Sequence, residues 1–216
     1  MLPQQEPLQK NSLLSIGGML MLLFYTFQNF IPGIEKIPFI VGLGITVLIV
    51  IVSLLLFLPE LKRDVPMFCE HIGTYSRFFF PKFLRFFVLY YAVALVLTII
   101  TQAPAANQAL LSQISLPILA FSALIYAPVV EEVIYRGFLR RWFDSDKAFI
   151  LVSALIFGAI HMLHPGQTTM QYLYIIEYAM LGGFLAWLYV KSDNICLAMM
   201  GHFFLNLAAF IPMMFM

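Results

Sequence analysis

Apolar residues run along this chain in long blocks instead of the short alternation typical of a soluble domain. Residues 12–31 and 37–58 carry no charged side chain, and further apolar blocks follow in the rest of the chain. A helix of about 20 apolar residues crosses the hydrocarbon core of a bilayer. The pattern therefore predicts an all-α, polytopic membrane protein with about seven transmembrane helices, at 12–31, 37–58, 83–101, 114–142, 147–163, 168–190 and 195–216.

Polar residues separate these blocks. The longest interruption, residues 59–82, contains "PELKRD" and the segment "HIGTYSRFFF", which we expect to be amphipathic. Between the fourth and fifth blocks only the short turn "DSDK" is polar, so these two helices are expected to be antiparallel neighbours. Because no repeat or linker divides the chain, residues 1–216 are predicted to form one transmembrane domain.

Composition supports the membrane interpretation. Hydrophobic residues make up 62% of the chain and charged residues 11%, whereas soluble domains average about 45–50% and about 25%. The formal net charge is +1 and no basic tract is present, so nucleic acid is not an expected partner. The two cysteines have no metal-site or disulfide spacing. The lipid bilayer is the expected environment.

The distribution of lysine and arginine predicts the orientation. In a seven-span model, eleven of the twelve basic residues fall on one side and only Lys36 on the other. Basic residues concentrate in cytoplasmic loops. We therefore expect a cytoplasmic N-terminus and a multi-pass protein of the cell membrane. The short chain with few residues outside the membrane favours a prokaryotic plasma membrane.

Several polar side chains fall inside the predicted spans. A charged side chain at the centre of a bilayer costs about 2.5–3.5 kcal/mol by insertion measurements, so such residues mark functional sites by default. They are Glu131, Glu132, His161, Glu177, His202 and Asn206.

Chain distances from the turns predict which of these side chains lie at one depth. Glu131 lies 14 residues before Ser145 and His161 lies 16 residues after it, which places them at nearly the same level on antiparallel helices. His202, eight residues beyond the next turn, reaches a similar level. One carboxylate and two imidazoles are therefore expected to converge in the cytoplasmic half of the bilayer.

The two adjacent glutamates are expected to have different roles. They point about 100° apart around a helix, and Glu132 is four residues before Arg136, the spacing of a helical ion pair. Glu132 is therefore assigned to Arg136 as a structural pair, which leaves Glu131 facing a cavity. Pro128 is expected to free the carbonyl of Leu124 and to kink this helix.

Three motifs now carry a resemblance to a known family. The segments "EEVIYR" (131–136), "FGAIH" (157–161) and "HFFLN" (202–206) resemble, in this order and each on its own span, the EExxxR, FxxxH and HxxxN motifs of the CPBP family. This family comprises CAAX prenyl proteases and bacteriocin-processing proteins and is also called the Abi group. The likeness covers residues 114–210 as a catalytic core, while the N-terminal spans, 1–113, vary among such proteins.

The resemblance implies an intramembrane endopeptidase and a role for each matched residue. Glu131 and His161 would activate water, and His202 with Asn206 would bind the oxyanion. The chemistry is consistent, since amide hydrolysis needs a base for water and donors for a tetrahedral oxyanion. No serine or cysteine accompanies these groups as a nucleophile. Glu177 has two interpretations: it bonds a neighbouring tyrosine hydroxyl, or it lines the cavity.

Cofactor use has two interpretations. Glu131, His161 and His202 together with a water would satisfy a catalytic zinc ion. The chain has no HExxH motif, however, and each candidate ligand comes from a different helix. We therefore favour water activation without a metal, and zinc remains the alternative.

The function also has alternatives. The expected substrate is a peptide or small membrane protein, and a small peptide precursor is favoured over a prenylated protein. A bacteriocin immunity or peptide-binding protein without proteolysis is the second hypothesis. A transporter is the third, because intramembrane Glu and His also form proton relays. The chain shows no inverted repeat, which disfavours the transporter.

Overall fold

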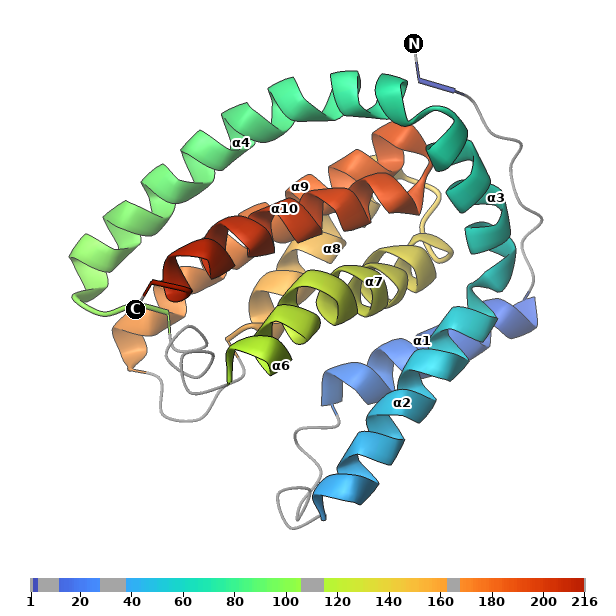
Figure 1. Ribbon diagram of the computed structural model, residues 1–216, viewed down its shortest axis with the longest axis horizontal. Coiled ribbons are helices and arrows are strands. Elements are labelled where there is room, and N and C mark those ends of the chain that lie inside the picture. The colour runs from blue at the N-terminus through green and yellow to red at the C-terminus, as the bar shows by residue number, and fades with distance from the viewer. Residues whose placement is uncertain (1, 4–11, 28–37, 106–114, 163–167, 216) are drawn as a thin grey trace.

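The computed structural model describes residues 2–3, 12–27, 38–105, 115–162 and 168–215 (Figure 1). Within these ranges the chain is helical and contains no strand. The main helices are α1 (Ser12–Phe27), α2 (Phe39–Leu56), α3 (Leu58–Glu70), α4 (Ile72–Thr101), α8 (Asp146–Ile160), α9 (Ile175–Ser192) and α10 (Ile195–Met213). The all-α prediction is confirmed.

Apart from the bend at Phe57 and a few residues at the block ends, each predicted apolar block is helical where the structure describes it. Among the described residues, four helices are long and apolar enough to cross a membrane, and the number rises to five if the bent pair α2–α3 is one span. The helices α1 and α8 are shorter, with 16 and 15 residues. The protein is therefore a polytopic helical membrane protein, and seven as the number of crossings stays a prediction.

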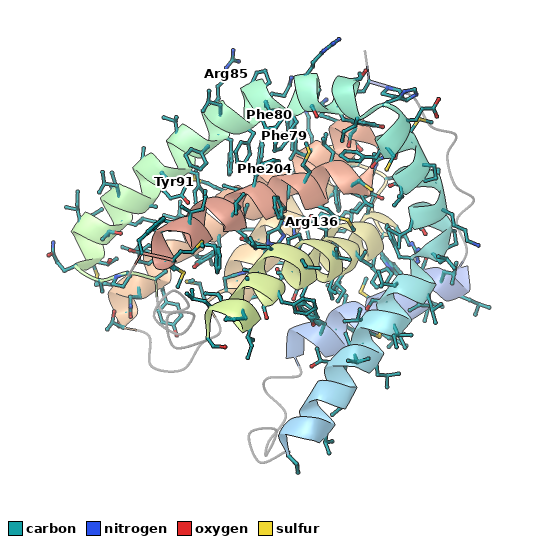
Figure 2. The ribbon with its side chains drawn as sticks, viewed as in Figure 1. Phe79, Phe80, Arg85, Tyr91, Arg136 and Phe204 are labelled. Carbon is teal, nitrogen blue, oxygen red and sulfur yellow. The ribbon has the colours of Figure 1, made fainter. Side chains whose placement is uncertain are left out.

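The segment "HIGTYSRFFF", which the sequence places in the polar stretch before the third span, is continuous with that span. Apart from its first residue it forms the beginning of α4, which runs for 30 residues without interruption. The reason is burial at helical spacing: Tyr75 and Phe79, four residues apart, are both 0% exposed. The Phe79 ring also packs 5.9 Å from the ring of Phe204 on α10 (Figure 2).

The helices are arranged around a central pair. α9 and α10 lie side by side, α8 packs against α9, and the helix that carries the two glutamates packs against α10. On the opposite side α4 arches over α9 and α10 (Figure 1). α1 and α2 form the edge of the bundle. The candidate site residues thus lie on elements that all contact α9 or α10.

A sharp bend of 75° separates α2 from α3. The residue at the bend, Phe57, is 0% exposed, and its ring occupies the space beside Gly137, where an added Cβ would meet it at 2.5 Å. Next to it, Arg141 donates to the carboxylate of Glu60 and to the carbonyl of Leu56, which ends α2. These contacts fasten the N-terminal half to the segment that contains the two glutamates.

A second attachment joins α3 to the start of α10. The buried carboxylate of Asp64 accepts the backbone N–H of Ile195 at 2.8 Å and pairs with Arg63 at 2.8 Å. The side chain of Asn194 caps α10 and donates to the carbonyl of Asp64. Burial raises the pKa of Asp64 above its ordinary value of 3.8, while the Ile195 hydrogen bond and the Arg63 ion pair partly offset the rise.

Candidate active site

The helix that carries the two glutamates is continuous from Leu116 to Phe138. It consists of α6 (Leu116–Phe121), the π-helical η3 (Ser122–Tyr126), α7 (Ala127–Glu132) and the π-helical η4 (Val133–Phe138). The predicted continuous span is confirmed. Single π-helical turns within α-helices occur frequently at functional sites, and here one lies on each side of the short segment that ends with the glutamates.

The first π turn leaves one backbone carbonyl without its helical partner. The N–H of Ala127 donates to the carbonyl of Ser122, five residues earlier. In an α-helix that N–H would serve Ala123, and the next residue, Pro128, has no N–H to offer. The side chain of Asn206 donates to the carbonyl of Ala123 instead, at 2.7 Å. Asn206 therefore joins α10 to the proline-containing turn.

The sequence predicted that Pro128 frees the carbonyl of Leu124. The carbonyl that Asn206 binds belongs to Ala123, one residue before Leu124, because the π turn shifts the hydrogen-bond register. An Asn amide has two N–H groups, and the one bound to Ala123 leaves the other for a second acceptor.

The core of the site is a buried cluster around Glu132. Its Oε1 accepts from Nη1 of Arg136 at 2.8 Å and contacts Nδ1 of His202 at 2.8 Å. All three side chains are almost wholly buried. Arg136 also donates to the carbonyl of Gly182 and lies over the Phe157 ring, with its Cζ 4.3 Å from the centroid. The predicted Glu132–Arg136 pair is confirmed.

His202 is oriented by this cluster. A carboxylate that binds one imidazole nitrogen fixes the tautomer and the ring orientation, and directs the other nitrogen elsewhere. With Nδ1 facing Glu132, Nε2 is the nitrogen left for a substrate or a water. The sequence grouped His202 with Glu131 and did not predict its contact with Glu132.

Glu131 has a different environment. It is half-buried, and within the described part of the chain its Oε2 is a buried atom with no hydrogen-bond partner. It lies within electrostatic range of His202, Glu132 and Arg136. The ion pair with Arg136 is formed by Glu132 and not by Glu131.

His161 lies at the end of α8. Its Nδ1 is 2.8 Å from the carbonyl oxygen of Phe157, and its ring stacks on Tyr178 with a centroid distance of 4.6 Å. The centroid of the Phe157 ring lies 4.3 Å from that of His161 and 6.0 Å from that of His202, so both histidines pack beside one phenylalanine. That Glu131 and both histidines share one water stays a prediction.

No group of three or more His, Cys, Asp or Glu side chains in the described ranges is arranged to hold a metal ion. Glu131, His161 and His202 lie in those ranges.

Glu177 lies away from this cluster. It is 2% exposed and faces the contact between α9 and α4, where the hydroxyl of Tyr90 interacts with its carboxyl group. The sequence interpretation that Glu177 bonds a tyrosine is consistent with this contact. This tyrosine comes from α4 and is not one of the sequence neighbours of Glu177, because the packing of α4 decides which of its rings faces α9.

Sequence reasoning missed two tyrosines near Glu131. Tyr25 on α1 and Tyr126 on η3 interact through their hydroxyl groups, and both lie within electrostatic range of Glu131. Neither residue belongs to a motif, and tyrosine is common in membrane helices. Only the packing of α1 against η4 brings Tyr25 to this place.

The comparison with known families identifies one matching family. Residues 113–208 match the model of the family described as type II CAAX prenyl endopeptidase Rce1-like. This segment is an Rce1-like domain. The finding confirms the resemblance that the three motifs predicted, and it supports an intramembrane CAAX-type endopeptidase. No curated protein and no solved structure matches the chain.

The Rce1-like domain contains most of the candidate site but not all of its neighbours. Glu131, Glu132, His161, His202 and Asn206 all lie inside it. The helices α1 to α4 precede it, so Tyr25 is a neighbour of Glu131 that the domain itself does not contain.

Proposed function

We propose that this protein is an intramembrane endopeptidase that hydrolyses a peptide bond through water activated by Glu131 and His161, with His202 and Asn206 as the oxyanion site. The observation that carries the proposal is the difference between the contacts of the two adjacent glutamates. Oε1 of Glu132 binds both Arg136 and His202, whereas Glu131 takes no part in that ion pair. Among the described residues, Oε2 of Glu131 is buried without a hydrogen-bond partner, as is Oε2 of Glu132. A carboxylate available for water is what a general base requires.

The reaction would proceed by direct attack of water. Glu131 accepts a proton from the water as its oxygen bonds to the carbonyl carbon, which forms a tetrahedral oxyanion. His161 stabilises the transferred proton. The oxyanion then collapses, the C–N bond breaks, and the proton passes to the leaving amine, which yields a carboxylic acid and an amine.

Two donors would stabilise the oxyanion. Asn206 offers its second amide N–H, since the first is bound to Ala123. His202 donates through Nε2 when its ring is protonated, and the carboxylate of Glu132 at Nδ1 stabilises that cation. Donors fixed before the reaction are effective because they need no reorganisation as charge develops.

Metal independence is part of the proposal. It is supported by Asn206, whose amide already binds a backbone carbonyl, because an amide donor suits oxyanion binding and is not a usual zinc ligand. Purified protein should keep its peptidase activity after tight chelation. Loss of activity that returns when zinc is added would favour the metal mechanism.

We propose a small peptide precursor in the cytoplasmic leaflet of the plasma membrane as the substrate, with the N-terminus of the protein in the cytoplasm. The orientation rests on the eleven-to-one distribution of basic residues. A reporter fused after Met216 is expected to face away from the cytoplasm, and a cytoplasmic reporter would reverse the orientation.

The decisive experiment compares membrane peptides from cells that produce the wild type or the Glu131→Gln protein. Mass spectrometry should detect a peptide pair, precursor and product, that only the wild type converts. Glu70→Gln, an exposed glutamate on α3, is the matched control and should behave as the wild type. Protection of cells against a bacteriocin by both proteins, with no cleaved peptide, would instead support the immunity hypothesis.

A further inference from the structure

The helix α1 packs on the Rce1-like domain at a close contact between Gly18 and Phe138. A Cβ added to Gly18 would lie 2.7 Å from the Phe138 ring, so only glycine permits this approach. α1 and the helix Leu116–Phe138, which ends at Phe138, run antiparallel (Figure 1). Seven residues are close to two helical turns, and a step of seven from Gly18 reaches Tyr25 while a step of seven back from Phe138 reaches Glu131. Tyr25 is therefore level with Glu131.

Ring contacts place Tyr25 on the same face as Glu131. Its ring meets Tyr135 edge-to-face, with 5.9 Å between the centroids. Tyr135 follows Glu131 by four residues and so shares its face of the helix. At its other end, the Tyr25 hydroxyl interacts with that of Tyr126, which precedes Glu131 by five residues. The side chain of Tyr25 thus extends along the helix beside the glutamate.

From this placement we propose that Tyr25 is a positioning residue of the active site, which acts with Tyr126 to hold the carboxylate of Glu131 and the water on its Oε2. This inference rests on the proposed function and deepens it. A neutral phenol both donates and accepts hydrogen bonds. A pair of phenols can therefore orient a water against a carboxylate oxygen that has no hydrogen-bond partner in the described part of the chain.

The proposal assigns a function to a helix outside the Rce1-like domain. Ring packing on Tyr135 by itself would be satisfied equally by phenylalanine, since the edge-to-face contact uses only the ring. The hydroxyl is therefore the group whose removal separates a positioning role from a packing role.

The experiment measures peptide cleavage and thermal unfolding for the full-length Tyr25→Phe, Tyr126→Phe and double variants. Each single variant should lower kcat about 10- to 100-fold, the effect of one hydrogen bond to a charged group. KM and the unfolding temperature should stay close to those of the wild type. Because the hydroxyls act as a pair, the double variant should be little worse than either single variant.

Two controls accompany these variants. Tyr91→Phe removes a hydroxyl from α4, far from α1, and should leave kcat unchanged. Gly18→Ala retains the Tyr25 hydroxyl but displaces α1 from Phe138, so it should lower both kcat and the unfolding temperature.

The outcomes distinguish this inference from the proposed function. If the wild type cleaves peptide and the Tyr25→Phe variant has the same kcat, the positioning role is overturned while the proposed endopeptidase activity is retained. A Tyr25→Phe variant that loses only thermal stability would assign the residue to packing and overturn the proposal as well. A wild type that cleaves nothing would overturn both.

Discussion

His202 Nδ1 lies 2.8 Å from Oε1 of Glu132, the oxygen that also binds Arg136. One carboxylate oxygen therefore joins a cation of its own helix to an imidazole of α10. The contact makes the second glutamate of the pair the centre of a buried polar cluster, and it leaves the first glutamate available for other chemistry.

Glu131→Gln should abolish cleavage without unfolding the protein. The amide keeps the shape of the side chain but cannot accept the proton from water. Peptide cleavage and thermal unfolding in detergent check this expectation, with the exposed Glu70→Gln as the control. A Glu131→Gln protein that cleaves at the wild-type rate would remove this residue from the mechanism.

Glu132→Ala should lower both activity and stability. It leaves Arg136 buried without its carboxylate, and breaking a buried pair from one side costs about 3–5 kcal/mol. The double variant Glu132→Ala/Arg136→Met removes both charges, so its unfolding temperature should recover while its activity should not, because His202 still lacks its partner. Recovery of activity in the double variant would contradict the orienting role of Glu132.

Asn206→Ala should reduce the rate about 10²–10³-fold, the effect of one lost oxyanion donor. It also leaves the carbonyl of Ala123 without its hydrogen bond. Adding Pro128→Ala supplies a backbone N–H at that turn, so stability should return in part while the rate should not. If the rate returns together with the stability, Asn206 is only structural.

The free energy of unfolding should depend on pH through Asp64, on α3 outside the predicted spans. Burial raises the pKa of Asp64 above 3.8, so the folded protein binds this proton more tightly than the unfolded chain. Stability from this group is fully present below about pH 3.8 and is lost as the pH rises through the raised pKa. Asp64→Asn, which can still accept from Ile195, should remove this part of the pH dependence. An unchanged dependence of the unfolding temperature on pH would contradict this.

Gly137→Ala should destabilise the attachment of the N-terminal half. The added Cβ would meet the Phe57 ring at 2.5 Å, and overpacking typically costs about 1–3 kcal/mol. Gly73→Ala is the matched control, since a Cβ there has no neighbour within 4 Å among the described residues. Equal unfolding temperatures for the two variants would show that Phe57 moves aside freely.

Much of the candidate site could be predicted from the sequence because its signals are local. The Glu132–Arg136 pair follows from a spacing of four residues on one helix. Charged residues in apolar blocks indicate a site because burying a charge in the bilayer costs free energy. The depth of Glu131 and His161 was estimated from their distances to one turn. These inferences need only helix geometry and the polarity of the bilayer.

Other features could not be predicted because they depend on how helices rotate and pack. The contact of His202 with Glu132, and not with its neighbour, depends on the orientation of α10 about its axis. The π turn before Pro128 determines that Asn206 reaches the carbonyl of Ala123.

The sequence by itself determined an all-helical membrane protein and singled out its candidate site residues, because burial cost and helical periodicity act over a few residues. Only the tertiary structure decided that α4 begins within the polar stretch 59–82 and includes the segment expected to be amphipathic, and that Tyr25 of α1 lies beside Glu131. Both result from close packing between segments far apart in the chain, at Phe79 on Phe204 and at Gly18 on Phe138. Such contacts are fixed by the shapes of two surfaces together, and neither segment carries that information alone.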